Sequence, residues 1–460
     1  MIHGSFAFLV HFHSLGLFVD YRHIHTYTID SKKKKNTHTH THTQKRKVSI
    51  MVWYNQTVDA LRDFFANHHT QLPLAVATGA SMTVGLLLHF LLSDKHPQDS
   101  ILHCPRVVAV SSSGLESEND GLPLPTDVFP GARDVLTPYG SMRVYEWGPV
   151  DGSKVLFVHG ITTPCIALGG VAHALADQGC RVMLFDLFGR GYSDCPSDLP
   201  QDDRLFATQI LLALSTSPIS WTGAGSGNFC LVGYSLGGGI AASFAAFFPQ
   251  LLSSLVLLAP AGLLRDSQIS FQSRLLYSRG LIPERVLGFL VGRRLRAGPL
   301  TSPKRKNGKI NAADALTEEL PSQGGPSPQL LSRAYPHVTV PGAVKWQVDS
   351  HAGFVHAFMS SMRHGPILLQ RQQKSWERLG EFLSTQSKLS PEEQRNNGLP
   401  SDKVLIMCGE HDPVIVKDEL VPDATSALQG NVEFKYFNAG HEFPSTKYDD
   451  VARALLEILH

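Results

Sequence analysis

Three polar residues stand directly after apolar segments, and their types are those that nucleophilic catalysis combines. Ser235 lies in GYSLG, Asp412 in GEHDP and His441 in NAGHEFP. A serine hydroxyl is a weak nucleophile at neutral pH, and a neighbouring imidazole activates it by accepting its proton. A carboxylate can hold that imidazole in one tautomer and stabilise its protonated form. The three residues are therefore a candidate catalytic set, provided that the fold brings them together.

The surroundings of Ser235 support this interpretation. Gly233 and Gly237 are the small residues that a sharp strand-to-helix turn needs on either side of an exposed nucleophilic serine. Each member of the set alone also has an ordinary interpretation, as a helix cap, a turn aspartate or a loop histidine. Two alternatives stay open within the set. Asp266 could supply the acid, and His411 could supply the base.

Attack on a carbonyl group also requires N–H donors for the oxyanion that develops. We expect one donor to be the backbone N–H of Leu236, which follows the serine. The backbone N–H of Ile161, in the loop after the apolar segment 154–158, is the natural second donor. His159, at the start of that loop, is expected to be structural and not a proton carrier.

Apolar segments alternate with helical patterns and predict the scaffold. Short, nearly continuous apolar runs separated by helices are typical of a parallel sheet covered on both faces. Ligands of such sheets bind beyond the carboxyl ends of the strands, where the polar residues above lie. The expected strands lie in 142–148, 154–158, 181–191, 228–234, 252–262, 402–412 and 431–441.

Composition excludes several classes of function. The chain has 460 residues, of which 43% are hydrophobic, and 41 Lys and Arg balance 40 Asp and Glu. No basic face of the kind that binds nucleic acid is evident, so we expect no nucleic-acid partner. Six cysteines show no metal-binding spacing, and we expect reduced core cysteines, no metal and no cofactor. The sequence gives no indication of the oligomeric state.

The N-terminal region is expected to lie outside the folded body. Residues 1–50 hold a lysine run and a Thr-His repeat, and we interpret them as disordered, low-complexity sequence translated upstream of a native start at Met51. Residues 51–71 precede 72–92, which contains no Asp, Glu, Lys or Arg. At about 1.5 Å per residue, that segment is long enough to span a bilayer core of about 30 Å. We expect a single transmembrane anchor there, followed by a polar linker at 93–135.

The body is expected to consist of one core and one insertion. Residues 136–262 and 402–460 carry the strand pattern, which stops at 263 and resumes at 402. Because the sheet pattern resumes, an inserted helical cap at 263–401 is favoured over an independent domain. The Pro-, Gly- and Ser-rich stretch 298–328 is expected to be a flexible loop within that cap.

These motifs together resemble the α/β-hydrolase fold family of serine hydrolases, in its lipase and esterase branch. FVHG, DLFGRGYSD, GYSLGG, GEHDP and AGH all match motifs of that superfamily. The resemblance implies an α/β fold with a mostly parallel central sheet, helices on both faces and an inserted cap. It further implies that Ser235 is the nucleophile, His441 the general base and Asp412 the orienting acid. The HxxxxD pattern of some acyl-transferring relatives is absent, since the matching position is Thr446.

With the predicted anchor in front of these motifs, the chain also resembles membrane-bound monoacylglycerol lipases. This resemblance implies a lipid-like carboxylic ester as substrate and a single-pass protein in an endomembrane such as the endoplasmic reticulum. Two other functions stay open. One is hydrolysis of carbon–carbon bonds with the same three residues, and the other is a non-catalytic scaffold of this fold.

Overall fold

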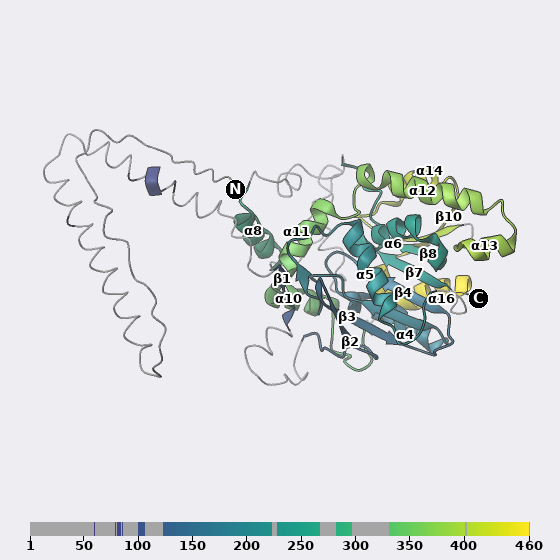
Figure 1. The fold of residues 1–460 in the computed structure, drawn as a ribbon, viewed down its shortest axis with the longest axis horizontal. Coiled ribbons are helices and arrows are strands. Elements are labelled where there is room, and N and C mark those ends of the chain that lie inside the picture. Colours follow the sequence, from purple (N-terminus) through teal and green to yellow (C-terminus); the bar gives the residue numbers. More distant parts are fainter. Residues whose placement is uncertain are drawn as a thin grey trace, which may run out of the picture. The chain divides into compact units, whose positions relative to one another are not determined.

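The computed structural model divides the chain into two units, Met1–Leu87 and Leu88–His460. The second unit holds the folded body (Figure 1). The structure describes residues 100–105, 123–222, 228–266, 282–296, 331–400 and 403–459, together with Asp59, Gly79, 81–83 and Gly85.

The body is organised around an eight-stranded sheet with the order β10-β9-β8-β7-β4-β5-β3-β2. All neighbouring strands from β10 to β5 run parallel, while β3 is antiparallel to both β5 and β2. The strands are β2 (Arg133–Thr137), β3 (Gly140–Trp147), β4 (Lys154–Val158), β5 (Arg181–Phe185), β7 (Phe229–Tyr234), β8 (Leu252–Leu258), β9 (Val404–Gly409) and β10 (Val432–Phe437). The mostly parallel central sheet predicted from the sequence is therefore confirmed.

Helices cover both faces of this sheet (Figure 1). On one face α6 packs on β7 and β8, and α5 and α12 pack on α6. On the other face α4 packs on β5, and α16 packs on α4. Because both faces are covered, every side chain of β7 and β9 is buried, which explains their continuous apolar sequences. The helices are α4 (Gly169–Asp177), α5 (Asp203–Ser215), α6 (Leu236–Phe247), α12 (Leu369–Gln386), α14 (Lys417–Ala427), α15 (Phe443–Thr446) and α16 (Tyr448–Leu459).

The interval 263–401 contains helices with two different packing partners. Helices α8 (Glu284–Arg296), α10 (Val340–Ser350) and α11 (Phe354–His364) pack against one another. Helix α12 instead packs against α6 and α14, on the face of the sheet. The short α13 (Pro391–Asn397) follows it before the sheet resumes at β9. The stretch 298–328 lies outside the described residues.

Part of the segment assigned to the linker 93–135 belongs to the body. Leu124, Val128 and Phe129 are buried in the hydrophobic core, and β2 begins at Arg133. Further upstream, the two-residue β1 (Ile101–Leu102) pairs with β6 (Cys195–Pro196). These contacts hold the chain against the sheet edge ahead of the predicted start of the core at residue 136.

The predicted anchor lies mostly outside the described residues, which include only Gly79, 81–83 and Gly85 of 72–92. Residues 1–50, and 51–71 apart from Asp59, also lie outside them. Among the residues that are described, no helix is long and apolar enough to cross a membrane. The anchor thus stays a prediction from the sequence.

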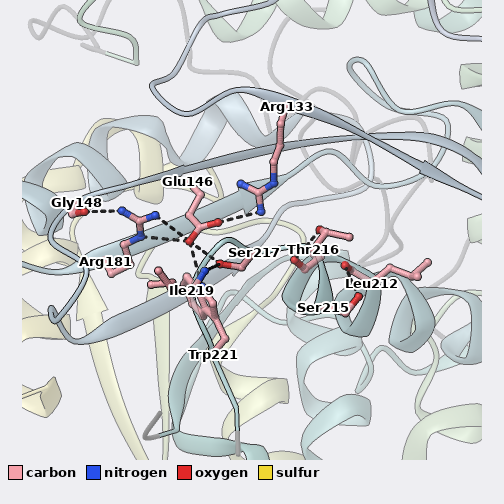
Figure 2. Close-up of polar contacts among 11 residues, drawn as sticks. Arg133, Glu146, Gly148, Arg181, Leu212, Ser215, Thr216, Ser217, Ile219 and Trp221 are labelled. Atoms are coloured by element: carbon pink, nitrogen blue, oxygen red, sulfur yellow. Dashed lines mark hydrogen bonds and ion pairs between the residues drawn. The ribbon is translucent and has the colours of Figure 1, made fainter. Parts of the chain in front are cut away.

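A buried carboxylate ties the edge strands to the segment after α5 (Figure 2). The side chain of Glu146, in β3, is 1% exposed and lies 2.9 Å from the guanidinium of Arg133 and 3.0 Å from that of Arg181. It also accepts hydrogen bonds from the Ser217 hydroxyl at 2.8 Å and the Trp221 indole N–H at 3.2 Å. Such a charge is tolerated in the interior because several donors compensate for its lost hydration. These contacts hold β2, β3 and β5 to the segment that follows α5.

All six cysteines fall within the described residues, and all six are buried without a disulfide. Cys230 and Cys408 lie in β7 and β9, as the sequence predicts, where a thiol packs as a small apolar group.

Candidate active site

Ser235 occupies a strained turn between β7 and α6. Its backbone has φ 54° and ψ −117°, a left-handed conformation that a residue with a Cβ seldom adopts. The turn also requires the two flanking glycines. A Cβ on Gly233 would lie 2.2 Å from the Gly237 carbonyl oxygen, and one on Gly237 would lie 2.1 Å from the Val158 carbonyl oxygen. The strand-to-helix turn expected for a nucleophilic serine is therefore present.

The structure brings the other two residues of the predicted set to Ser235. Asp412 follows β9, and His441 follows β10, its parallel neighbour in the sheet. His441 Nδ1 lies 2.7 Å from Asp412 Oδ2, and His441 Nε2 lies 3.0 Å from Ser235 Oγ. The two ring nitrogens thus contact a carboxylate and a hydroxyl at the same time. With the proton on Nδ1, Nε2 is an acceptor for the serine proton.

The aspartate is fixed by the backbone of its own loop. Asp412 Oδ1 accepts hydrogen bonds from the N–H groups of Val414 and Ile415, both at 2.8 Å. Its second oxygen remains directed at His441. Two N–H donors stabilise the ionised carboxylate, which is the form that can orient an imidazole and compensate an imidazolium.

The imidazole is held from a second side by Tyr234, the last residue of β7. The Tyr234 hydroxyl donates to the His441 carbonyl oxygen at 3.1 Å, and the two ring centroids lie 5.3 Å apart. Ser235 is 8% exposed and His441 is 1% exposed, so both side chains are largely shielded from solvent. Electrostatic interactions in such a setting are stronger than in water.

The two alternatives from the sequence do not occupy this arrangement. His411 Nε2 lies 3.1 Å from Asn438 Oδ1 at an exposed position, next to the acid and not beside Ser235. The hydrogen-bonded carboxylate at His441 is that of Asp412, and Asp266 lies after β8 on a different loop.

The loop 159–163 lies beside the start of α6. A Cβ on Gly237 would lie 2.7 Å from the His159 carbonyl oxygen, so the first turn of the helix packs directly on this loop. Ile161, in the loop, is 5% exposed, and Leu236 is the first residue of α6. The N–H groups of a first helical turn have no partner inside the helix and favour negative charge. Both predicted oxyanion donors are thus located on adjacent segments.

His159 holds this loop in place, as the sequence interpretation expects. Its Nδ1 lies 2.8 Å from the Gly160 carbonyl oxygen, and its Nε2 accepts a hydrogen bond from the Leu187 N–H at 2.8 Å. Burial lowers the pKa of His159 to about 3, with a further lowering by the charge of Arg190. The ring is therefore neutral at physiological pH and serves as a fixed donor and acceptor.

Sequence reasoning missed two buried side chains that contact the same loop. Arg190 donates to the Ile161 carbonyl oxygen, and Gln347 donates to the Thr162 carbonyl oxygen. Arg190 stands inside DLFGRGYSD, a motif noted only as a structural turn. Nothing in the sequence pairs Gln347 with a residue 185 positions earlier.

Comparison with known proteins identifies the fold family of this chain. A family model described as "alpha/beta hydrolase fold" matches residues 154–448, more than half of the 460 residues. The chain belongs to the alpha/beta hydrolase fold family. The match includes all three residues of the hydrogen-bonded set. The match starts at the first residue of β4 and ends at the first residue of α16.

Individual relatives of this hydrolase-fold chain are more distant. An uncharacterized protein of Mycobacterium tuberculosis is 33% identical over 146 residues, which are 32% of this chain and 40% of the relative. Lipase LipV of the same organism is 31% identical over 130 residues, 28% of this chain and 45% of the lipase. The alignments span less than half the length of these relatives. Among solved structures, an esterase from Exiguobacterium antarcticum matches at TM-score 0.43 and 16% identity, over 71% of this chain and 98% of the esterase.

Proposed function

We propose that this chain is a serine hydrolase that cleaves carboxylic esters through an acyl-enzyme on Ser235. The observation that carries the proposal is the unbroken hydrogen-bonded series from Asp412 through His441 to Ser235. The strained turn adds to it. A φ of 54° at a non-glycine residue costs free energy, and strained residues of this kind cluster at active sites.

In the proposed reaction, Ser235 Oγ attacks the ester carbonyl carbon while His441 Nε2 accepts the serine proton. The tetrahedral intermediate collapses when the C–O bond to the alcohol breaks and His441 returns the proton to the departing oxygen. Water then attacks the acyl-enzyme, giving its proton to His441, and Ser235 leaves protonated with release of the carboxylic acid. Asp412 remains ionised throughout and stabilises the imidazolium of each step. No cofactor is needed.

Leu236 and Ile161 are the proposed donors to the oxyanion. Their N–H groups belong to the first turn of α6 and to the loop 159–163, whose carbonyl groups are hydrogen-bonded by buried side chains. Donors that are fixed in advance require no reorganisation when the negative charge develops, which is why they favour the transition state over the ground state.

The proposed substrates are lipid-like esters of the monoacylglycerol type, reached from an endomembrane such as the endoplasmic reticulum. Two features support this. Residues 72–92 are long and apolar enough to anchor the chain. In addition, α8 exposes Phe289 (64%) and Leu290 (43%), and Arg293 lies in the last turn of the same helix. Apolar side chains next to arginines are typical of helices at a lipid–water interface.

The experiment is a substrate comparison on the full-length protein in detergent. We expect hydrolysis of monoacylglycerols and long-chain p-nitrophenyl esters at rates well above those for acetate esters, and none for Ser235→Ala. Turnover of a vinylogous diketone without ester turnover would instead favour the carbon–carbon bond hydrolase. A folded protein without activity on either class would favour the scaffold.

A further inference from the structure

The peptide groups of the loop 159–163 are held by side chains from elsewhere in the fold. Arg190, in the loop after β5, is wholly buried, and its Nε donates to the Ile161 carbonyl oxygen at 3.2 Å. Gln347, in α10, is also wholly buried, and its Nε2 donates to the Thr162 carbonyl oxygen.

The N–H and C=O of a trans peptide point in opposite directions. The Ile161 carbonyl shares its peptide group with the Thr162 N–H, and the Thr162 carbonyl shares its peptide group with the Thr163 N–H, so these bonds fix the two peptide groups that follow the Ile161 N–H. The Ile161 N–H itself shares its peptide group with the Gly160 carbonyl, which lies 2.8 Å from His159 Nδ1.

The other nitrogens of the Arg190 guanidinium donate to residues of α11 and to the loop that contains Arg190 itself. Nη2 donates to the Ser361 hydroxyl at 2.8 Å and to the Ala357 carbonyl oxygen at 3.4 Å. Nη1 donates to the Phe188 carbonyl oxygen at 3.0 Å. The donors of a planar guanidinium have fixed relative directions. A displacement of α11 is therefore transmitted to Ile161 through one rigid group.

Gln347 makes an equivalent connection from α10. While its Nε2 donates to Thr162, its Oε1 accepts a hydrogen bond from the Gly191 N–H at 3.2 Å. One amide thus joins α10, the loop 159–163 and the loop that contains Arg190. Both polar ends of the buried amide are satisfied, which makes its position well defined.

We infer that Arg190 and Gln347 are positioning residues. By fixing the two peptide groups that follow Ile161, they hold the backbone position of Ile161 and of its N–H, the proposed oxyanion donor, and they couple this position to the packing of α10 and α11. The inference rests on the proposed function, because it concerns the oxyanion of an ester reaction. Neither residue touches the reacting atoms. If the inference holds, α10 and α11 influence the rate of the chemical step itself, and not only the entry of substrate.

The first test removes the donors and keeps the apolar stem. For Arg190→Met we expect kcat on a soluble ester to fall about 10- to 100-fold, less than the roughly 10²- to 10³-fold loss seen when an oxyanion donor itself is removed. KM should change by less than about threefold, because the donors act mainly on the transition state. Gln347→Leu should lower kcat about fivefold to tenfold, since it removes one bond to the loop and keeps Arg190.

Matched variants separate positioning from general loss of packing. Arg143 is also a buried arginine, bonded to Asp134 and the Thr126 carbonyl oxygen. Gln372 is a buried glutamine in α12, bonded to Asp203. Arg143→Met and Gln372→Leu should destabilise the protein and leave kcat per active site unchanged. If Arg190→Met does not fold, Ser361→Ala removes only the 2.8 Å bond to α11 and should lower kcat about twofold to fivefold.

The decisive readout is the inhibition constant of a trifluoromethyl ketone, which forms a tetrahedral adduct with an active serine. Across the Arg190, Gln347 and Ser361 variants, log Ki should rise in step with the loss in log kcat/KM, with a slope near one. A wild-type kcat per titrated site in Arg190→Met, or an equal loss in the two control variants, would overturn the inference. Failure of the proposed function is distinguishable, because the wild-type protein itself would then hydrolyse no ester.

Discussion

His441 Nδ1 lies 2.7 Å from Asp412 Oδ2, and the two side chains are 1% and 0% exposed. The remaining oxygen of the aspartate accepts two backbone N–H bonds, so its orientation is fixed independently of the histidine. This pairing decides which ring nitrogen carries the proton. It leaves Nε2 as the acceptor that faces Ser235.

Asp412→Asn tests that assignment with almost no change in shape. The asparagine can still accept from Val414 and Ile415, but its NH₂ group then faces His441 and favours the tautomer with the proton on Nε2. That tautomer cannot accept the serine proton, and we expect kcat to fall about 10⁴-fold, as for the same change in a serine protease. The melting temperature should change little. A kcat within tenfold of the wild-type value would contradict the assignment.

The same substitution is expected to have opposite effects on stability at two glycines, one in the strained turn and one inside α8. In Gly237→Ala the new methyl group would lie 2.1 Å from a backbone oxygen of residue 158, and we expect a loss of about 1–3 kcal/mol in the free energy of unfolding. Gly288, inside α8, has nothing within 4 Å of an added Cβ. Gly288→Ala should raise the free energy of unfolding by about 0.5–1 kcal/mol. Urea unfolding measures both, and equal effects would be inconsistent with the turn described.

Buried histidines predict a loss of stability on acidification. Burial lowers the pKa of His159 to about 3 and the pKa of His351 to about 4. In the unfolded chain both have pKa values near 6.5. Between those limits the unfolded chain binds more protons than the folded protein, so stability falls as the pH is lowered from about 6.5 to 4.

His351→Gln isolates one of these contributions. His351 donates through Nε2 to the Ser193 carbonyl oxygen, and its Nδ1 accepts from the Gly353 N–H. The variant should be less stable than the wild type at pH 7.5. Below about pH 6, the difference should shrink by about 1.4 kcal/mol per pH unit. Urea unfolding at several pH values gives the two profiles, and parallel profiles would show that His351 does not remain neutral in the fold.

The exposed face of α8 predicts a dependence on the physical state of the substrate. Phe289→Ser combined with Leu290→Ser should lower activity on aggregated long-chain monoacylglycerol about tenfold, a loss of about 1.4 kcal/mol and less than the full burial of one such side chain provides. Activity on a soluble short-chain ester should not change. Equal losses on both substrates would point to misfolding, and no loss on either would remove α8 from substrate recognition.

The sequence predicted β3, β4, β5, β7, β8, β9 and β10, together with the three residues that the structure joins by hydrogen bonds. Buried parallel strands have apolar residues at nearly every position, and the polar residues stand at their carboxyl ends in recognisable motifs. The strand β2 was not predicted because its sequence, RDVLT, is short and mostly polar. Of its five residues only Val135 is buried, so it shows no apolar run. Its place in the sheet comes from pairing with β3.

The packing partners of helices and side chains were harder to predict from the sequence than the helices and strands themselves. The amphipathic pattern of α12 predicts a helix, but not that its apolar face covers α6 instead of joining α10 and α11. Likewise, Arg190 and Gln347 are single polar residues with no periodic signal. Their partners lie 29 and 185 positions away in the sequence, so only the folded chain shows that both contact the same loop.

The most direct test of the central claim is labelling with a fluorophosphonate probe, followed by peptide mapping of the full-length protein. Such probes phosphonylate a serine that a neighbouring base has activated. We predict one labelled site, on the peptide that contains Ser235, with labelling abolished in Ser235→Ala and strongly slowed in Asp412→Asn. Labelling at another serine, or a folded wild-type protein that is not labelled, would contradict the account.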